Sequence, residues 1–401
     1  MWIFQTNEGP SFPAHQFLFG GTSAPVFPGD PNNYYLDFVA ENGDSGCPGT
    51  GGGPDWINPV GIELTDPNHS QCYDHNTLVT YQDTNNVVYD KTGNLINGGW
   101  KYYAQTNGAI WDAPEANPQA CYFATSGSGA CSATEFGSHV VIAKNSKLTS
   151  APILKDIKNC QLAAISWVTP DEAWSDHPGS GDKSLGPSWV ADIVDAIGNS
   201  WTQSKGGGVC DYWGTNSTTN PEPTAIFVTW DDWGGFFDHV PPPAVYLGDL
   251  SATGQAECTI NEAPNGWGCG YVYGYRVPLL VLSEYTPAGT ISGKTSLTTA
   301  YPPPKEWTHD FGSILSFTEH NFNLGPIAPS GYTYADQNSL DSNGGLFVPL
   351  WEFFLAKTPR GFTSIAPQSS AYDANYFMNY YTTLQNGGYP VETGPDGGDD
   401  D

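Results

Sequence analysis

The sequence predicts an α/β fold, a three-layer α/β/α sandwich around a mostly parallel central sheet with long loop insertions. Three apolar runs have the length and composition of strands buried on both faces, namely QLAAISWV (161–168), TAIFVTW (224–230) and YRVPLLVLS (275–283). A helical pattern separates the first two runs, and strand–helix–strand order is typical of a parallel sheet with helices on both faces. Ligands bind beyond the carboxyl ends of such strands, and all three runs end in polar clusters.

Two helices are predicted beside these strands. The first begins after Ser188, a candidate N-cap, and ends at Gly198. Its apolar residues recur at helical spacing and would form one face: Val190, Ile193, Val194 and Ile197. The second helix is predicted over about 311–321, with Asp310 at its N-cap position.

Composition and charge limit the class of protein. The chain has 401 residues with 47 glycines and 33 prolines, which favours a loop-rich fold over a helical bundle. We predict one domain over 1–390 that lacks its first strand, a loop-rich insertion region over 28–150, and a disordered acidic tail over 391–401. The formal net charge of −29 repels nucleic acid, so no nucleic-acid partner is expected.

Eight cysteines indicate an oxidising compartment. None forms a CxxC pair, which argues against a zinc ribbon, and the close spacings 121/131 and 258/269 indicate disulfides. We therefore predict a secreted or periplasmic protein. No run of 18 apolar residues predicts a transmembrane segment. Met1 is followed directly by WIFQTNEGPSFPAHQ, which has no signal-peptide pattern, so we expect the true start to lie upstream.

The stretch TWDDWGGFFDHVPPP (229–243) carries the strongest signal for chemistry. Asp231 and Asp232 follow an apolar run directly, and their carboxylates suit a divalent cation such as Zn²⁺, Ca²⁺, Mn²⁺ or Mg²⁺. A solvated Asx-turn at the end of a strand is the alternative. Two glycines at 234 and 235 permit a tight reversal that would return Asp238 and His239 to the strand end.

Four other polar residues are candidate site residues, and most of them also have an ordinary structural explanation. His177 in WSDHPGSG is either a site residue or an ordinary loop histidine, and His309 either serves a site or simply precedes the helix cap. Ser11 lies in GPSFPAHQ close to His15, and it is either a site residue or a helix N-cap without chemistry. The sequence has no G-x-S-x-G elbow and no glycine-rich phosphate loop.

Taken together, five segments resemble the bacterial phosphoesterase family of phospholipase C and acid phosphatase enzymes, within the alkaline-phosphatase-like superfamily. The segments occur in the family's order: GPSFPAHQFLFGGTSAP, ISWVTPDEAWSDHP, FVTWDDWGGFFDHVPPP, GYRVPLLVLSEY and THDFGSILSFTEHNF. The resemblance implies hydrolysis of phosphate esters at a metal site, with a phospholipid among the candidate substrates.

The resemblance also implies roles for individual residues. Ser11 matches the nucleophile, and Asp231 and Asp232 match metal ligands. His177 matches a histidine beside the phosphate, which would act as an acid or a clamp. With these we predict two further groups of site residues, His239 as catalytic, and His15 and His309 as substrate-binding.

The chain departs from the family pattern at three places. No segment matches the E-N-x-S-F-D start whose Glu and Asn bind metal, Trp233 stands where the family has His, and D-F-G-S (310–313) replaces Asp-His-Thr-Ser. His309 is a candidate for the missing imidazole. We therefore expect a secreted, metal-dependent phosphoesterase that uses a serine nucleophile. The alternative is a secreted binding protein on a degenerate, inactive phosphatase-like scaffold.

Overall fold

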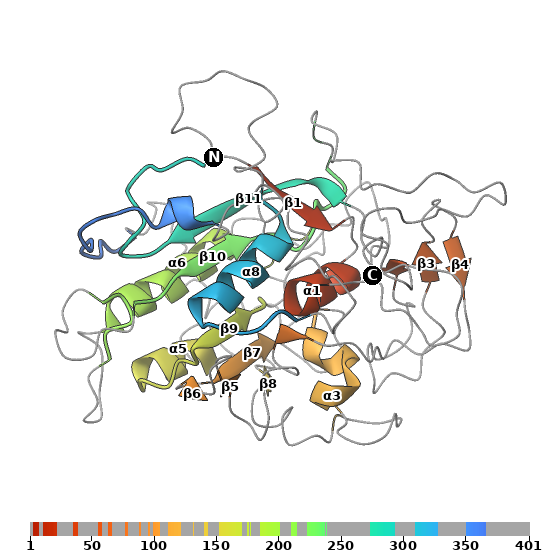
Figure 1. Ribbon diagram of the computed structural model, residues 1–401, viewed down its shortest axis with the longest axis horizontal. Helices are drawn as coiled ribbons and strands as arrows, with labels where there is room; N and C mark the ends of the chain where they lie inside the picture. Colours follow the sequence, from red (N-terminus) through yellow and green to blue (C-terminus); the bar gives the residue numbers. More distant parts are fainter. Residues whose placement is uncertain are drawn as a thin grey trace, which may run out of the picture.

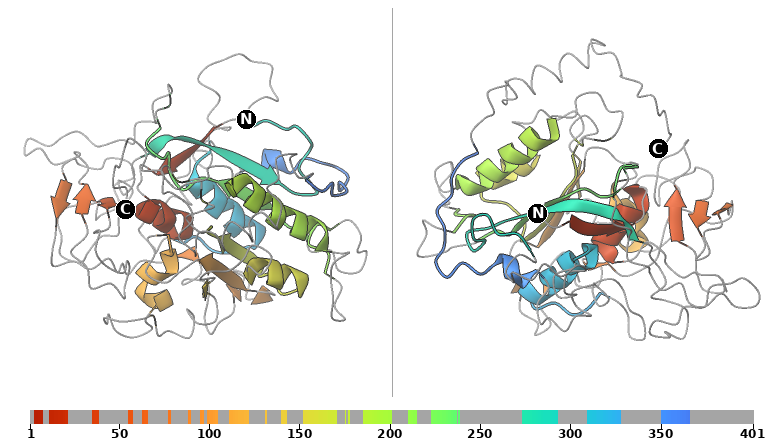
Figure 2. Two further views of the ribbon diagram at one scale, coloured as in Figure 1. Left: turned by 180° about the vertical axis from the view of Figure 1, so that it is seen from behind. Right: turned by 90° about the horizontal axis from the view of Figure 1, so that it is seen from above.

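Two three-stranded sheets share one layer, with helices on both sides of it (Figures 1 and 2). The computed structural model describes residues 3–7, 11–21, 35–38, 55–57, 63–65, 77–78, 88–89, 95–96, 99–104, 111–121, 131, 140–142, 152–170, 175, 177, 185–200, 210–214, 223–236, 238, 273–292, 309–327 and 350–365. The predicted acidic tail over 391–401 lies outside these residues.

The first sheet is parallel and has the strand order β8-β7-β9. Its strands are β7 (Trp100–Ala104), β8 (Val140–Ile142) and β9 (Ile165–Val168). β9 is the first of the three apolar runs, so its direction and its place in a parallel sheet agree with the prediction. The α/β class predicted from the sequence is confirmed.

The second sheet has the order β1-β11-β10, and its central strand runs against both neighbours. Its strands are β1 (Ile3–Asn7), β10 (Ile226–Thr229) and β11 (Tyr273–Leu282). The predicted direction of the third apolar run, β11, was therefore wrong, and its polar end at Ser283 and Glu284 lies at the opposite edge. An apolar run carries no direction, and the 43 residues from 230 to 272 leave the next strand free to run either way.

Smaller elements complete the described structure. Two further sheets are antiparallel: β2 (Tyr35–Phe38) with β3 (Asp55–Ile57) and β4 (Glu63–Thr65), and β5 (Val88–Tyr89) with β6 (Leu95–Ile96). The helices are α1 (Ser11–Gly20), α3 (Pro118–Cys121), α5 (Pro152–Lys158), α6 (Leu185–Gly198) and α8 (Phe311–Asn321), with two 3₁₀ turns, η1 (Ala113–Ala116) and η6 (Trp351–Phe353).

Alternate strand residues pack against different helical layers, which gives the three-layer arrangement. Ile226 of β10 packs in the cluster of α5 and α6, whereas its neighbour Phe227 packs in the cluster of α1 and α8. In β7, Tyr103 belongs to the α5 and α6 side and Tyr102 to the opposite side. Successive strand residues point to opposite faces, so both faces of both sheets are covered. The right panel of Figure 2 shows α6 and α8 on opposite sides of β11.

The predicted start of one helix is confirmed, and the predicted start of the other is wrong. α8 spans 311–321 as predicted, and Asp310 caps it by accepting a hydrogen bond from the Ser313 amide at 3.1 Å. α6 ends at Gly198 as predicted, but Ser188 is not its N-cap because the helix begins at Leu185. Pro187 fits inside the first turn, where an amide N–H has no partner within the helix.

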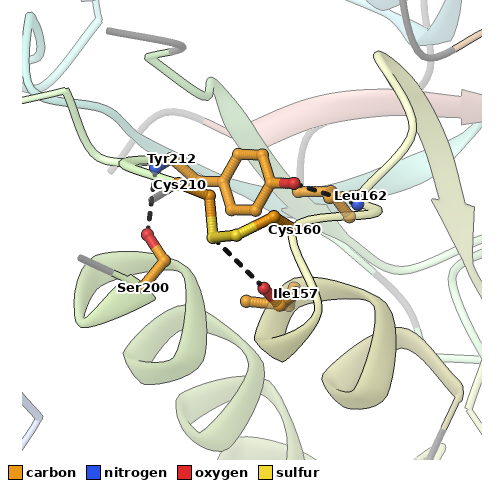
Figure 3. The surroundings of a disulfide bond; sticks show 6 residues. All are labelled: Ile157, Cys160, Leu162, Ser200, Cys210 and Tyr212. Atoms are coloured by element: carbon orange, nitrogen blue, oxygen red, sulfur yellow. Dashed lines mark hydrogen bonds between the residues drawn. A yellow bond between two sulfur atoms is a disulfide. The ribbon is translucent and has the colours of Figure 1, made fainter. Parts of the chain in front are cut away.

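Two disulfides lie within the described residues. The predicted pair Cys121–Cys131 is confirmed, and 258/269 lies outside the described residues. The second bond, Cys160–Cys210, ties the segment after α5 to the one after α6 (Figure 3). Next to it, the Leu162 amide donates to the Tyr212 hydroxyl at 3.1 Å. In the part of the chain that the structure describes, no helix is long and apolar enough to cross a membrane.

We predict that the longer disulfide loop stabilises the fold more than the shorter one. Cys160–Cys210 joins residues 50 positions apart and Cys121–Cys131 joins residues 10 apart. The loss of loop entropy in the unfolded chain corresponds to about 4 kcal/mol for the first bond and about 3 kcal/mol for the second. Urea unfolding of the two double Cys→Ala variants should show the larger loss for Cys160/Cys210. The reverse order would contradict the prediction.

Candidate active site

Ser11 and Asp232 meet where β1 and β10 end. Both strands run antiparallel to β11, so their carboxyl ends lie at the same edge of the sheet. α1 begins at Ser11 shortly after β1, and Asp232 follows β10. The Ser11 hydroxyl donates a hydrogen bond to Oδ2 of Asp232 at 3.4 Å, and Ser11 is only 8% exposed.

His15 lies on the same face of α1, one turn after Ser11. Its Nε2 lies 3.3 Å from Oδ2 of Asp231, and its Nδ1 lies 3.1 Å from the hydroxyl of Tyr102. Tyr102 comes from β7, so this histidine joins the two sheets at the site. α1 is held there because Phe17 and Phe19 are buried in the cores on either side of it.

The hydrogen bonds around Tyr102 define the protons on His15. The Tyr102 hydroxyl donates to the carbonyl of Trp111 at 2.6 Å and accepts from Thr169 Oγ1 at 3.3 Å. Its only proton is therefore used, so Nδ1 of His15 must donate to it. Nε2 faces the carboxylate of Asp231, which also requires a donor. Both ring nitrogens of His15 therefore face hydrogen-bond acceptors.

The environment drives the pKa values of the two aspartates apart. Burial alone would raise the pKa of Asp231, but the hydrogen bond and charge of His15 lower it to about 2. Burial and the neighbouring charge of Asp231 raise the pKa of Asp232 to about 6, against opposing effects of Gly234, His15 and His177. Two carboxylates with separated pKa values are typical of acid–base and ion-binding sites.

The Asx-turn, which was one of the two alternatives for this stretch, is present, and the site remains a prediction. Oδ1 of Asp232 accepts a hydrogen bond from the amide of Gly234 at 2.6 Å, which is an Asx-turn. Gly234 and Gly235 have φ angles of 59° and 73°, the left-handed region that glycine adopts without strain. The turn uses one oxygen of Asp232 and leaves the other for Ser11. The predicted return of Asp238 also occurs, because Asp238 contacts Arg276 of β11.

The remaining predicted histidines have different positions. The charge of His177 acts on Asp232, which puts His177 within electrostatic range of the site. His309 is buried, and its Nε2 contacts Glu352 and lies 3.3 Å from Oγ of Ser292. His239 lies outside the described residues. The structure therefore brings Ser11, His15, Asp231 and Asp232 together, and the roles of all seven residues stay predictions.

Three residues near the site were missed from the sequence. Thr169 follows β9 directly, so the strand-end criterion used for Asp231 could have found it. Tyr102 and Arg276 lie inside strands, where only the pairing of distant segments reveals their contacts. Nothing in their local sequence distinguishes them from core or surface residues.

The sequence profile described as "Phosphoesterase family" matches residues 2–206 and 213–325. The chain therefore belongs to the phosphoesterase family, a family of hydrolases that act on phosphate esters.

Several curated relatives are named phospholipases C. A non-hemolytic phospholipase C of Burkholderia pseudomallei is 29% identical over 181 residues, which is 42% of this chain and 20% of the relative. A non-hemolytic phospholipase C of Pseudomonas aeruginosa is 25% identical over 181 residues, 42% of this chain and 21% of the relative. Phospholipase C B of Mycobacterium tuberculosis is 30% identical over 139 residues, 33% of this chain and 22% of the relative. The matched part is thus about a fifth of each relative's length.

We predict that Asp232 costs stability at neutral pH in metal-free solution. Its folded pKa of about 6 lies above the ordinary value of 3.8. The folded state therefore favours the protonated carboxyl group, and this contribution to stability is fully present below pH 3.8 and lost as pH rises through 6. The Asp232→Asn variant should be more stable than wild type by about 1–3 kcal/mol at pH 7. Urea unfolding in EDTA at pH 3.5, 5 and 7 measures the difference, which should vanish at the lowest pH. An equal difference at all three values would contradict it.

Proposed function

We propose that this chain hydrolyses phosphate esters with Ser11 as the nucleophile. The hydrogen bond of 3.4 Å from the Ser11 hydroxyl to Asp232 carries this proposal. It joins a nearly buried hydroxyl directly to a carboxylate. A nucleophile beside a proton acceptor, with a histidine one turn away, supports phosphoryl transfer.

The proposed reaction has two steps. As Oγ of Ser11 bonds to phosphorus, its proton leaves along the hydrogen bond towards Oδ2 of Asp232. The bond from phosphorus to the leaving alkoxide breaks, and His177 supplies a proton to that oxygen or holds the phosphate. Water then attacks the phosphoserine, Asp232 returns the proton to Oγ of Ser11, and a proton of the water restores His177. The serine is regenerated, and the product is phosphate from a monoester or phosphocholine from phosphatidylcholine. His15 supports both steps by placing positive charge beside Asp231 and the phosphoryl oxygens.

A divalent cation held by Asp231 and Asp232 is part of this proposal. Among the described residues, no group of three or more His, Cys, Asp and Glu side chains is arranged to hold a metal ion. The two carboxylates and the Ser11 hydroxyl nevertheless fit the oxygen chemistry that such ions prefer, as part of a site. A bound cation would stabilise the phosphoryl oxygens and lower the pKa of the serine hydroxyl.

The proposed substrates are a phospholipid or a soluble phosphate monoester. The name phospholipase C of the relatives supports the first. The negative net charge disfavours an anionic lipid surface and leaves a zwitterionic one open. We also propose secretion or export to the periplasm, because two disulfides in the described residues require an oxidising compartment.

We predict that Ser11→Ala lowers phosphate release by at least about a thousandfold, because it removes the nucleophile itself. Release of p-nitrophenol from p-nitrophenyl phosphate and of phosphocholine from a phosphatidylcholine analogue separates the two substrate classes. Ser166→Ala is the matched control, since this hydroxyl on β9 donates to the carbonyl of Ala163 and lies outside the proposed site. Equal activity of Ser11→Ala and the control would overturn the assignment of Ser11 as the nucleophile.

We further predict that phosphate release depends on a divalent metal ion and that replacing Asp231 or Asp232 weakens the binding of this ion. EDTA should abolish phosphate release, and a divalent ion should restore it. Asp231→Asn should bind metal at least about tenfold more weakly than wild type, because the ligand loses its charge. Calorimetric titration of the metal-free chain measures this affinity. Wild-type protein that neither binds a divalent ion nor releases phosphate would instead support the binding-protein alternative.

A further inference from the structure

A buried ion pair anchors the far end of the turn that carries the two aspartates. Arg276 donates to Asp238 through both Nε and Nη2, and the Nη2–Oδ1 distance is 2.9 Å. Their side chains are only 13% and 12% exposed. A guanidinium fork that meets both oxygens of a carboxylate defines orientation as well as distance, which a lysine cannot do.

The near end of the same turn is attached to the same strand. Pairing between β10 and β11 ends at Thr229 and Leu279, and Oγ1 of Thr229 donates to the carbonyl of Pro278 at 3.0 Å. The chain then leaves the sheet and returns to β11 at Arg276. The described residues 230–236 and 238, which we call the acidic turn, are thus attached to β11 at both ends.

A third contact holds the middle of the acidic turn. The ring of Trp233 packs edge-on against Tyr275, with ring centroids 5.3 Å apart. Tyr275 and Arg276 are adjacent in a strand, so their side chains leave opposite faces of it. The acidic turn therefore contacts side chains from both faces of β11. Asp231 and Asp232 lie between Thr229 and Trp233, and both of these residues contact β11.

We propose that Arg276 and Asp238 form a positioning pair that sets the acidic turn relative to Ser11. This inference rests on the proposed function and adds two residues to it. Neither residue touches the reacting atoms. They act by holding the end of the acidic turn at Asp238. The position of the acidic turn then sets the direction from which Oδ2 of Asp232 approaches the Ser11 hydroxyl. A site of this kind loses rate when its groups shift by about 1 Å.

The chain offers a matched control for a merely structural ion pair. Lys101 and Asp156 form a comparable pair between β7 and α5, with side chains 24% and 14% exposed. Lys101 precedes Tyr102 in the strand and so points to the opposite face, towards α5. Lys101→Met should therefore lower stability without changing the site.

The kinetic test compares Arg276→Lys, Arg276→Met, Asp238→Asn and the Arg276→Met/Asp238→Asn double variant. We expect kcat on p-nitrophenyl phosphate to fall about 100-fold in Arg276→Met, with KM changed less than about threefold. The double variant should lose no more than the worse single variant, because both break one pair. Arg276→Lys should retain intermediate activity. If Arg276→Met does not fold, the lysine and asparagine variants carry the test. Losses of kcat no greater than that of Lys101→Met would overturn the proposal.

A second readout does not depend on turnover. Hydrogen exchange of the Gly234 amide, which is bonded to Asp232, reports the order of the acidic turn directly. Exchange should be at least about tenfold faster in Arg276→Lys and Asp238→Asn than in wild type, and unchanged in Lys101→Met. Unchanged exchange in the first two variants overturns the positioning role. Wild-type protein without phosphate release overturns the proposed function alone, since the exchange result still decides the positioning.

Discussion

The reversed direction of β11 is the constraint on which the site depends. Because β11 runs against both β1 and β10, those two strands run parallel to each other and end at one edge. Their ends carry the start of α1 and the acidic turn, so Ser11 and Asp232 meet although 221 residues separate them. Pro278 has no N–H to donate, and the pairing with β10 stops at its neighbour Leu279. The chain after Thr229 is thereby free to leave the sheet.

The parallel sheet of β8, β7 and β9 contributes to the site through a chain of hydrogen bonds. The Tyr102 hydroxyl of β7 lies against the ring of His15 and accepts from Thr169 after β9, and His15 in turn contacts Asp231. The two sheets share the helical layers that cover them, so their carboxyl edges face the same solvent region without a direct ladder between the described strands. A site built across two sheets in this way is rigid because each half is anchored in its own core.

The charges of Asp231 and Asp232 work against folding. Two adjacent carboxylates in a partly buried position repel each other, and the structure compensates one of them with His15 and leaves the other with a raised pKa. A protein core alone would not select such an arrangement. Like charges held this close are typical of sites that bind an ion or a proton, which supports the proposed function.

The sequence by itself determined the local features of this protein. Apolar runs predicted β9 and β10, the capping pattern at Asp310 predicted α8, and the glycines at 234 and 235 predicted the turn, because each depends on residues close in the chain. The tertiary structure alone decided the direction of β11, the start of α6 and the contacts of Tyr102 and Arg276. Strand direction and long-range pairing follow from how distant segments bury one another, and no short stretch of sequence contains that information. The acids 231 and 232 could be found from the sequence, whereas their partners His15 and Ser11 could be joined to them only by the fold.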